Sequence, residues 1–453
     1  MKTRISYGVH GKAILTLGLP IIGSHQAQML LHVTDTVLLG WYDVEALAAV
    51  VLAASFFFML FILGSGFGIA LLGGVAAALG RGDETGVRRE TRMGMWLSIL
   101  FSVLTIPLFW WSAPLLIACG QEPGTSMLAQ EFLRIAGWGM APALIVMVLK
   151  STLAALERTQ VVLWVTLAAA GLNFCVAWAF IFGHWGAPEL GVRGAALASL
   201  FTQTVTCLAL MAYAGLSDAS RRFNLFQRFW RPDWQAFWQV ARLGLPVGLT
   251  GLAESGLFIA AAVMMGWIGT AELAAHGIAM ELTAVAFMVH LGLSNAATVR
   301  VGRALGEGDR QAMGDAARAA ILLSAGFAGA MILTFLFLPE PLIRLFLDPE
   351  DPLAPRILAI GTGLLAVGAL FQLFDAMQAI ALGLLRGVQD TQMPLVIAAF
   401  SYWMVGVTVS YLLAFPLGME GTGLWLGLAV GLALAALLLM ARFWRGVWFT
   451  APA

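Results

Sequence analysis

Four acidic residues lie deep inside long apolar stretches of this sequence, namely Asp35, Glu254, Glu281 and Asp375. Ionisable residues within membrane segments are costly, and they mark ion or substrate pathways. The sequence places no Lys or Arg at comparable depth, so these carboxylates have no evident basic partner. Unpaired carboxylates in a low dielectric take up protons or bind cations. The chemistry that these residues favour is therefore the exchange of one cation for another.

Each acid also has a structural interpretation. Asp35, Glu254 and Asp375 could be protonated acids that are hydrogen-bonded for packing. Glu281 could cap a helix or contact the other half of the chain. We favour coupling-ion or substrate binding for the first three and leave both readings open for Glu281. The histidine to test is His32, which lies three residues before Asp35 on the same helix face, although its role is open.

The sequence contains an internal repeat. A shift of 226 residues aligns Leu17–Pro20 with Leu243–Pro246 without a gap. The same shift places Gln28 opposite Glu254, so the acids were placed individually and are not required by symmetric packing. Gln28 is itself a candidate site residue. The shift also aligns two glycine–aspartate pairs, Gly82-Asp83 and Gly308-Asp309.

The composition predicts a membrane protein. Of the 453 residues, 60% are hydrophobic and 11% charged, against roughly 25% charged in soluble domains. The formal net charge of zero gives no support for nucleic-acid binding. No zinc-protease, serine-hydrolase or phosphate-loop motif is present, so we do not expect an enzyme. We also expect no cofactor.

The apolar runs predict an all-α membrane protein with twelve transmembrane helices in two six-helix bundles. An even repeat unit gives both copies the same orientation, as a parallel pseudo-two-fold repeat. We predict an N-lobe over 1–215, a basic-aromatic cytoplasmic linker over 216–238 and a C-lobe over 239–453. The predicted spans are 13–39, 46–79, 92–117, 127–149, 160–183, 191–214, 239–267, 273–302, 316–338, 356–384, 393–416 and 421–441.

The basic residues set the predicted orientation. With both termini in the cytoplasm, only Arg134, Arg193, Arg344 and Arg356 of the 25 Lys and Arg residues fall outside. Cytoplasmic loops are enriched in Lys and Arg. We therefore predict a multi-pass protein of the bacterial inner membrane.

Three segments resemble the multidrug and toxic compound extrusion (MATE) family, and the likeness extends over essentially the whole chain. The resemblance implies a pair of bundles that exports mostly cationic, amphipathic compounds against an inward flow of H⁺ or Na⁺. The segments are Val33-Thr34-Asp35-Thr36-Val37-Leu38-Leu39-Gly40, Val299-Arg300-Val301-Gly302-Arg303-Ala304-Leu305-Gly306, and Asp375-Ala376-Met377-Gln378 followed by Leu385-Arg386-Gly387.

The resemblance also implies site residues. Glu254 and Asp375 look like the cation pair of the NorM-like branch, which could hold Na⁺, and Gln378 belongs to the same motif. Phe371 stands where that branch carries a tyrosine, and the missing hydroxyl favours protons slightly over sodium ions.

Other matches fall in the N-terminal half and in the eighth span. Asp35 matches an aspartate used in proton coupling, and Asn173 matches the asparagine of its network. Ser199 falls where the family has a threonine, and Ala177 where one branch has a further aspartate. Glu281 resembles a glutamate of eukaryotic relatives.

The expected partners are small organic cations, H⁺ or Na⁺, and the lipid bilayer, and we expect a monomer. The alternative function is a flippase for lipid-linked saccharides from the same superfamily. Such substrates carry phosphates and need buried Arg or Lys. The intramembrane acids argue against that alternative.

Overall fold

The computed structural model describes residues 7–348, 350 and 352–450, and every regular element among them is helical. Within these residues, twelve helical segments are long and apolar enough to cross a membrane. The prediction of twelve spans in an all-α protein is confirmed. Contacts divide the chain into two compact units, Gly23–Gly248 and Met1–Ile22 with Leu249–Ala453, which are described separately below.

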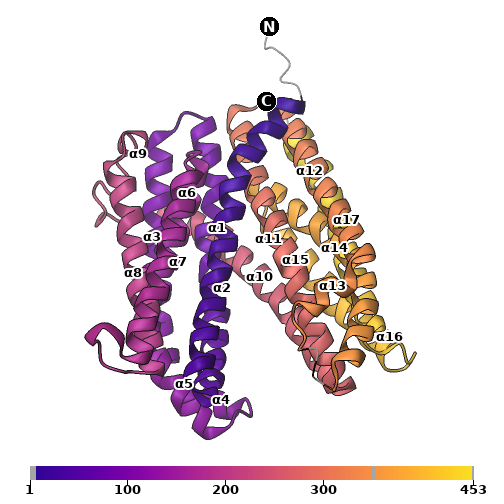
Figure 1. The fold of residues 1–453 in the computed structure, drawn as a ribbon. Helices are drawn as coiled ribbons and strands as arrows, with labels where there is room; N and C mark the ends of the chain where they lie inside the picture. Colours follow the sequence, from indigo (N-terminus) through magenta and orange to yellow (C-terminus); the bar gives the residue numbers. More distant parts are fainter. Residues whose placement is uncertain (1–6, 349, 351, 451–453) are drawn as a thin grey trace. The chain divides into compact units, whose positions relative to one another are not determined.

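The Gly23–Gly248 unit contains most of α1, α2 to α9 and the start of α10 (Figure 1). α2 packs against α3, α5 and α6, and α8 packs against α5, α6 and α7. The elements are α1 (Tyr7–Tyr42), α2 (Val44–Gly80), α3 (Glu84–Trp110), α4 (Ser112–Ala118), α5 (Pro123–Ala136), η1 (Gly137–Gly139), α6 (Met140–Ala155), α7 (Thr159–Phe182), η2 (His184–Gly186), α8 (Val192–Leu216) and α9 (Asp218–Arg221).

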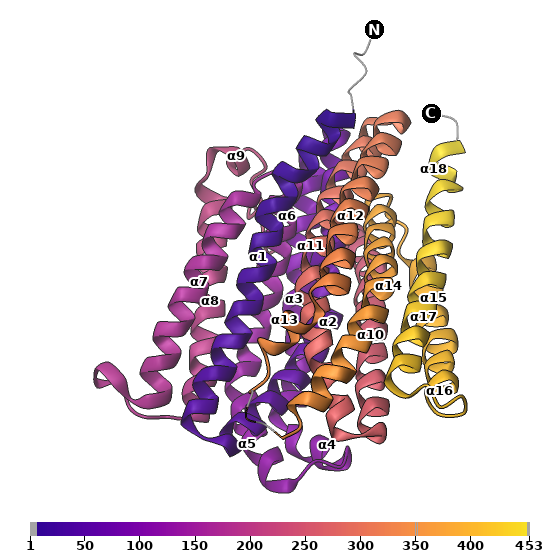
Figure 2. The same ribbon diagram turned by 45° about the vertical axis from the view of Figure 1, so that its right-hand side comes forward.

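The other unit is organised around α14, which packs against α11, α12 and α17. The segment from α15 to α16 lies beside α17 (Figure 2). The elements are α10 (Trp234–Ile268), α11 (Thr270–Glu307), α12 (Arg310–Phe337), α13 (Pro339–Arg344), α14 (Ala354–Gly387), α15 (Gln392–Ala399), η3 (Phe400–Val407), α16 (Thr408–Ala414), α17 (Glu420–Trp444) and α18 (Val447–Thr450).

The repeat is visible in two helix boundaries. Gly82 and Gly308 both have positive φ, at 73° and 68°, which glycine adopts without steric cost. The aspartate that follows each one caps the next helix, because Asp83 accepts a hydrogen bond from the amide of Gly86 and Asp309 from that of Ala312. The aligned glycine–aspartate pairs therefore form the same turn and the same helix cap in both copies.

The unit boundaries fall inside α1 and α10, just after Pro20 and Pro246, which lie well within these helices. The first turns of each of these helices therefore belong to the compact unit that contains most of the other repeat. A Cβ added to Gly292 of α11 would lie 2.4 Å from the Ile22 side chain. The repeat-equivalent Gly66 of α2 lies equally close to the backbone of Gly248. Small residues permit such close helix crossings.

The linker is folded against the start of α3. Arg89 donates two hydrogen bonds to the carboxylate of Asp233, and Trp96 Nε1 donates to the carbonyl of Phe229 at 2.9 Å. Asp233 also caps α10 through the amide of Ala236. α10 therefore starts five residues before the predicted span. The hydrogen bonds from Arg89 hold the pKa of Asp233 below its ordinary value.

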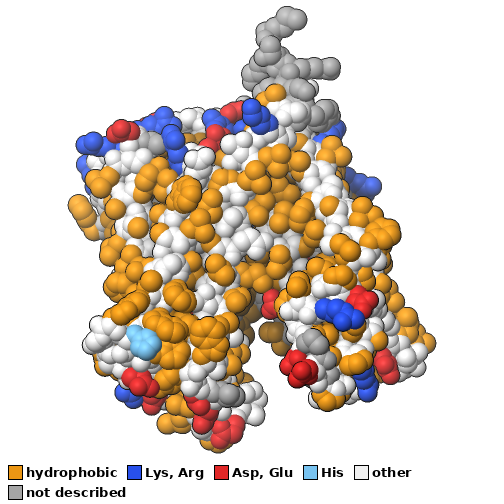
Figure 3. Space-filling view, in the orientation of Figure 1, with side chains coloured by type: hydrophobic (Ala, Val, Ile, Leu, Met, Phe, Trp, Pro, Cys, Tyr) orange, Lys and Arg blue, Asp and Glu red, His pale blue; other side chains and the backbone are white. Residues whose placement is uncertain are grey.

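Charge is distributed unevenly along the Gly23–Gly248 unit. On the face shown in Figure 3, Lys and Arg side chains gather at the end that carries α9, and hydrophobic side chains cover the middle. In the other unit, the start of α1 and α18 lie at the same end (Figures 1 and 2). An even number of spans requires the two ends of the chain to lie on the same side of the membrane.

Candidate coupling sites

The first polar cluster joins three helices of the Gly23–Gly248 unit. Asp35 on α1 accepts a hydrogen bond of 2.6 Å from Asn173 Nδ2 on α7. Asn173 Oδ1 in turn accepts one of 3.1 Å from Thr202 Oγ1 on α8. Asn173 and Thr202 are buried, and Asp35 is half-buried. The predicted pair of Asp35 and Asn173 is therefore brought together in a chain of carboxylate, amide and hydroxyl.

The hydroxyl in this cluster comes from Thr202, three residues beyond the predicted Ser199. Ser199 is half-buried on the same helix. Gln28 is also half-buried, two turns before Asp35 on the same face of α1. The side chain of His32 lies outside the described residues.

The second cluster lies in the other unit and has the same order of groups. Gln378 Nε2 on α14 donates a hydrogen bond of 2.6 Å to Glu254 Oε1 on α10. Asp375 lies one turn earlier on α14, is buried and interacts electrostatically with Glu254. Tyr402 OH donates to Gln378 Oε1 at 2.8 Å. Three predicted residues thus lie in one group, in which Asp375 and Gln378 are buried and Glu254 is half-buried, and the buried Tyr402 is a member that the sequence did not indicate.

Tyr402 lies on a π-helical segment, η3, which positions its side chain in this cluster. Buried residues recur at every fourth position through α15, η3 and α16. In an α-helix, four residues turn through about 400°, so each buried residue would be rotated by about 40° from the one before it. The wider turns of a π-helix counteract this rotation, so one face stays buried over the whole segment. This row consists of Ala398, Tyr402, Gly406, Ser410 and Ala414.

Phe371 lies outside the polar group, in an aromatic cage. Its ring centroid is 5.3 Å from that of Trp425 and 6.1 Å from that of Phe258. Trp425 Nε1 donates a hydrogen bond of 3.0 Å to His276 Nδ1. Phe371 therefore packs against apolar ring surface, one turn from Asp375.

Two basic residues correct the expectation that none lies at depth. Arg386, at the end of α14, interacts electrostatically with Glu254 and Tyr402. Lys150 lies five residues before the end of α6 and interacts with His25. The sequence assigned both to cytoplasmic segments, because each directly follows an apolar run.

Glu281 is exposed on α11, and the structure does not bring it into either cluster among the described residues. Within the same described ranges there is no group of three or more His, Cys, Asp or Glu side chains arranged to hold a metal ion. The groups gathered at the two clusters are carboxylates, amides and hydroxyls. They are suited to binding protons or a monovalent cation.

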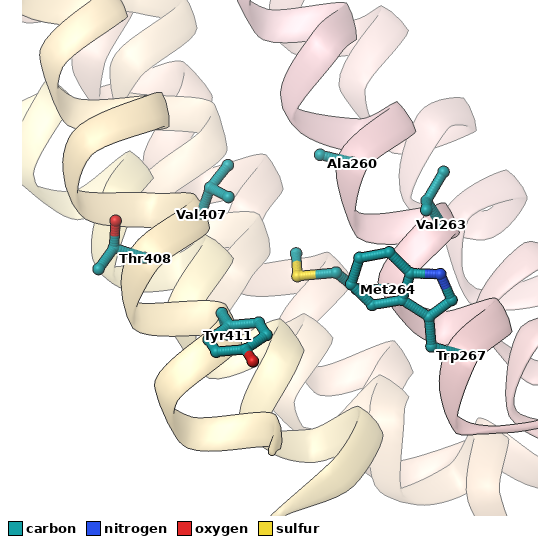
Figure 4. Close-up of a pocket in the computed structure, with 7 residues that line it drawn as sticks. All are labelled: Ala260, Val263, Met264, Trp267, Val407, Thr408 and Tyr411. Carbon is teal, nitrogen blue, oxygen red and sulfur yellow. The ribbon is translucent and has the colours of Figure 1, made fainter. Parts of the chain in front are cut away.

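A separate pocket of about 470 Å³ opens between α10 and the segment formed by η3 and α16. Trp267 and Met264 line one wall and Tyr411 the other (Figure 4). Its lining side chains carry no charge. The pocket therefore offers apolar and aromatic surface and is distinct from the polar cluster around Gln378.

Together, the repeat of membrane-length helices and the polar cluster with a carboxylate in each unit define a polytopic membrane protein with internal polar sites. The MatE family matches this chain over residues 20–179 and 246–412. The two matched segments begin 226 residues apart, at the spacing of the internal repeat. The chain belongs to the MATE family of transporters.

Similar proteins support the same placement. The "Probable multidrug resistance protein NorM" of Rhizobium meliloti (strain 1021) is 46% identical over 97% of this chain and 94% of its own length. That of Agrobacterium fabrum (strain C58) is 43% identical over the same shares. The chain therefore falls in the NorM-like branch.

Solved structures show the same fold at lower sequence identity. An "outward-facing conformation of a multidrug resistance MATE family transporter of the MOP superfamily" has a TM-score of 0.87 at 20% identity, covering 98% of this chain and 97% of that one. The "eukaryotic MATE transporter AtDTX14" has a TM-score of 0.86 at 18% identity, with the same coverage.

Proposed function

We propose that this protein is a cation-coupled multidrug antiporter that exports cationic amphipathic compounds by alternating access of two lobes. The observation that carries this proposal is the pair of carboxylate clusters, one in each compact unit. The names of the NorM relatives support multidrug compounds as the substrate class. We further propose a monomer in the bacterial inner membrane with both termini in the cytoplasm.

The coupling ion is H⁺ or Na⁺, and the carboxylates are its binding groups. Glu254 and Asp375 lie close enough to repel each other when both are ionised. Binding of one cation relieves this repulsion, and a cationic compound competes for the same charge. One charge that moves through 100 mV supplies about 2.3 kcal/mol, which is enough for more than a tenfold gradient.

The flippase alternative is less consistent with these clusters. A phosphate-bearing substrate is bound by Arg or Lys side chains that donate hydrogen bonds to it. The carboxylates of Asp35, Glu254 and Asp375 would repel phosphate, and the positive charge of Arg386 is already opposed by Glu254. The geometry therefore favours a cationic substrate.

Ethidium efflux from cells tests the proposal. The variants Asp375→Asn and Glu254→Gln each keep the size of the side chain but remove its charge, so active efflux should fall to the level of cells without the protein. Glu340→Gln is the matched control, since Glu340 is exposed and pairs with Arg344 on one short helix. Full efflux by the double variant of Asp375 and Glu254 would reject their role in coupling.

A further inference from the structure

Both clusters present an amide N–H, and not an amide oxygen, to their carboxylates. In the C-terminal cluster, Gln378 Nε2 donates to Glu254 Oε1. In the other, Asn173 donates to Asp35. An amide has one donor end and one acceptor end, so the choice of end decides which ion the cluster suits.

A hydroxyl fixes the orientation of each amide. Tyr402 OH donates to Gln378 Oε1, and Thr202 Oγ1 donates to Asn173 Oδ1. All four of these residues are buried, with Gln378 and Tyr402 wholly inaccessible. Turning either amide over would bring its carbonyl oxygen against a carboxylate and leave the hydroxyl facing N–H groups. The hydroxyl therefore holds the N–H groups towards the acids.

The repeat does not account for this common polarity. Near these residues the offset between the copies is 232, as the positive-φ residues Glu157 and Gln389 show, so Val405 lies opposite Asn173 and Val146 opposite Gln378. The two chains of carboxylate, amide and hydroxyl therefore arise at positions that are not equivalent. The same arrangement built twice from different helices indicates a shared requirement of the two sites.

An N–H donor next to a carboxylate is compatible with a proton but not with a bare metal cation. Hard cations are bound by several oxygen ligands, including amide and backbone carbonyls. At Glu254, the Gln378 carbonyl oxygen is already engaged by Tyr402.

We propose that Tyr402 and Gln378 make the C-terminal carboxylate site selective for protons over sodium ions, by holding the amide with its N–H groups towards Glu254. This inference rests on the proposed antiport, because it names the coupling ion of that site. Tyr402 acts through Gln378 and is a positioning residue. The π-helical segment η3 is the element that brings it there.

The test uses the full chain, purified and reconstituted in proteoliposomes, with ethidium transport driven by a pH gradient or a sodium gradient alone. Wild type should respond to the pH gradient only. Tyr402→Phe removes the hydroxyl that holds the amide, and loss of one such hydrogen bond changes the balance of amide orientations on the order of tenfold. The variant should therefore gain sodium-driven transport and bind ²²Na⁺ on the order of tenfold more tightly than wild type. Tyr411→Phe is the matched control, since Tyr411 is half-exposed, lies on α16 and should change neither readout.

A second variant keeps the proposal testable if Tyr402→Phe fails to fold. Gln378→Glu supplies a carboxylate oxygen in place of the N–H groups and should also bind ²²Na⁺ more tightly. Sodium-driven transport by wild type, or equal ²²Na⁺ binding by wild type and both variants, would overturn the inference while leaving antiport intact. Lack of transport under any gradient in wild type would reject the proposed function, and the ²²Na⁺ measurement would still decide the inference.

Discussion

The hydroxyl of Thr202 gives the sharpest test of the N-terminal cluster. Thr202→Val removes the donor to Asn173 Oδ1 and keeps the shape of the side chain. The exposed fraction of Asn173 is 2% and that of Thr202 is 4%, so water cannot readily replace the lost bond. A buried acceptor left unsatisfied costs about 1–3 kcal/mol.

The lost hydrogen bond destabilises the orientation in which the Asn173 amide donates to Asp35. At about 1.4 kcal/mol for each factor of ten, the efflux rate should fall by roughly fivefold to a hundredfold if the transport cycle passes through this arrangement. Ethidium efflux should be measured at matched expression, together with the melting temperature of the purified variant. The melting temperature separates loss of the site from loss of the fold.

Ser199→Ala is the matched control, because Ser199 lies on the same helix and was the hydroxyl that the sequence favoured. Its efflux should stay within about twofold of wild type, in the range of substitutions away from special features. The reasoning is refuted if Thr202→Val keeps wild-type efflux, or if Ser199→Ala loses as much as Thr202→Val.

The remaining predictions concern other parts of the chain. Glu281→Gln should retain efflux within about twofold, since the side chain is exposed and lies outside both clusters; a complete loss of efflux would place it in the coupling site. Asp233→Asn should lower the melting temperature at neutral pH, with a cost on the order of 1 kcal/mol for this partly exposed pair. Because the pKa of Asp233 is depressed in the folded state, its contribution is present above the ordinary aspartate pKa and lost as the pH falls through the folded value. The melting curves of wild type and Asp233→Asn should therefore converge in acid, and a difference that persists there would contradict this account. Gly431→Val should destabilise the protein by about 1–3 kcal/mol, because an added Cβ would lie 2.7 Å from the backbone of η3. Gly329→Ala, where the added Cβ meets nothing within 4 Å, should not lower the melting temperature, and equal effects of the two changes would exclude packing as the cause.

Much of the fold could be predicted from the sequence because the bilayer imposes strong rules. The need for long apolar helices predicted the twelve spans. Breaks in the helix within a span were harder to predict from the sequence. One predicted span over 127–149 is built from α5, η1 and α6, since a short 3₁₀ turn keeps the apolar composition of its flanks.

The carboxylates of the sites were predictable because charge is conspicuous in an apolar segment. Their hydroxyl partners were not. Thr202 and Ser199 differ by less than one helical turn, and only the packing of α7 against α8 decides which reaches Asn173. Tyr402 could not be predicted for another reason. Its direction depends on the π-helical turns of η3, whereas the spacing of a regular α-helix would place it on a different face of the helix.

The glycine crossings at Gly292 and Gly66 have a consequence for how this chain can be divided. The first turns of α1 belong to the compact unit that contains most of the second repeat, and the first turns of α10 belong to the unit that contains most of the first repeat. The arrangement is that of a segment exchange of the kind seen when two identical protomers swap an element. A chain cut within 222–232 therefore yields two fragments that each lack a piece of their own unit, and the two must be produced together to fold.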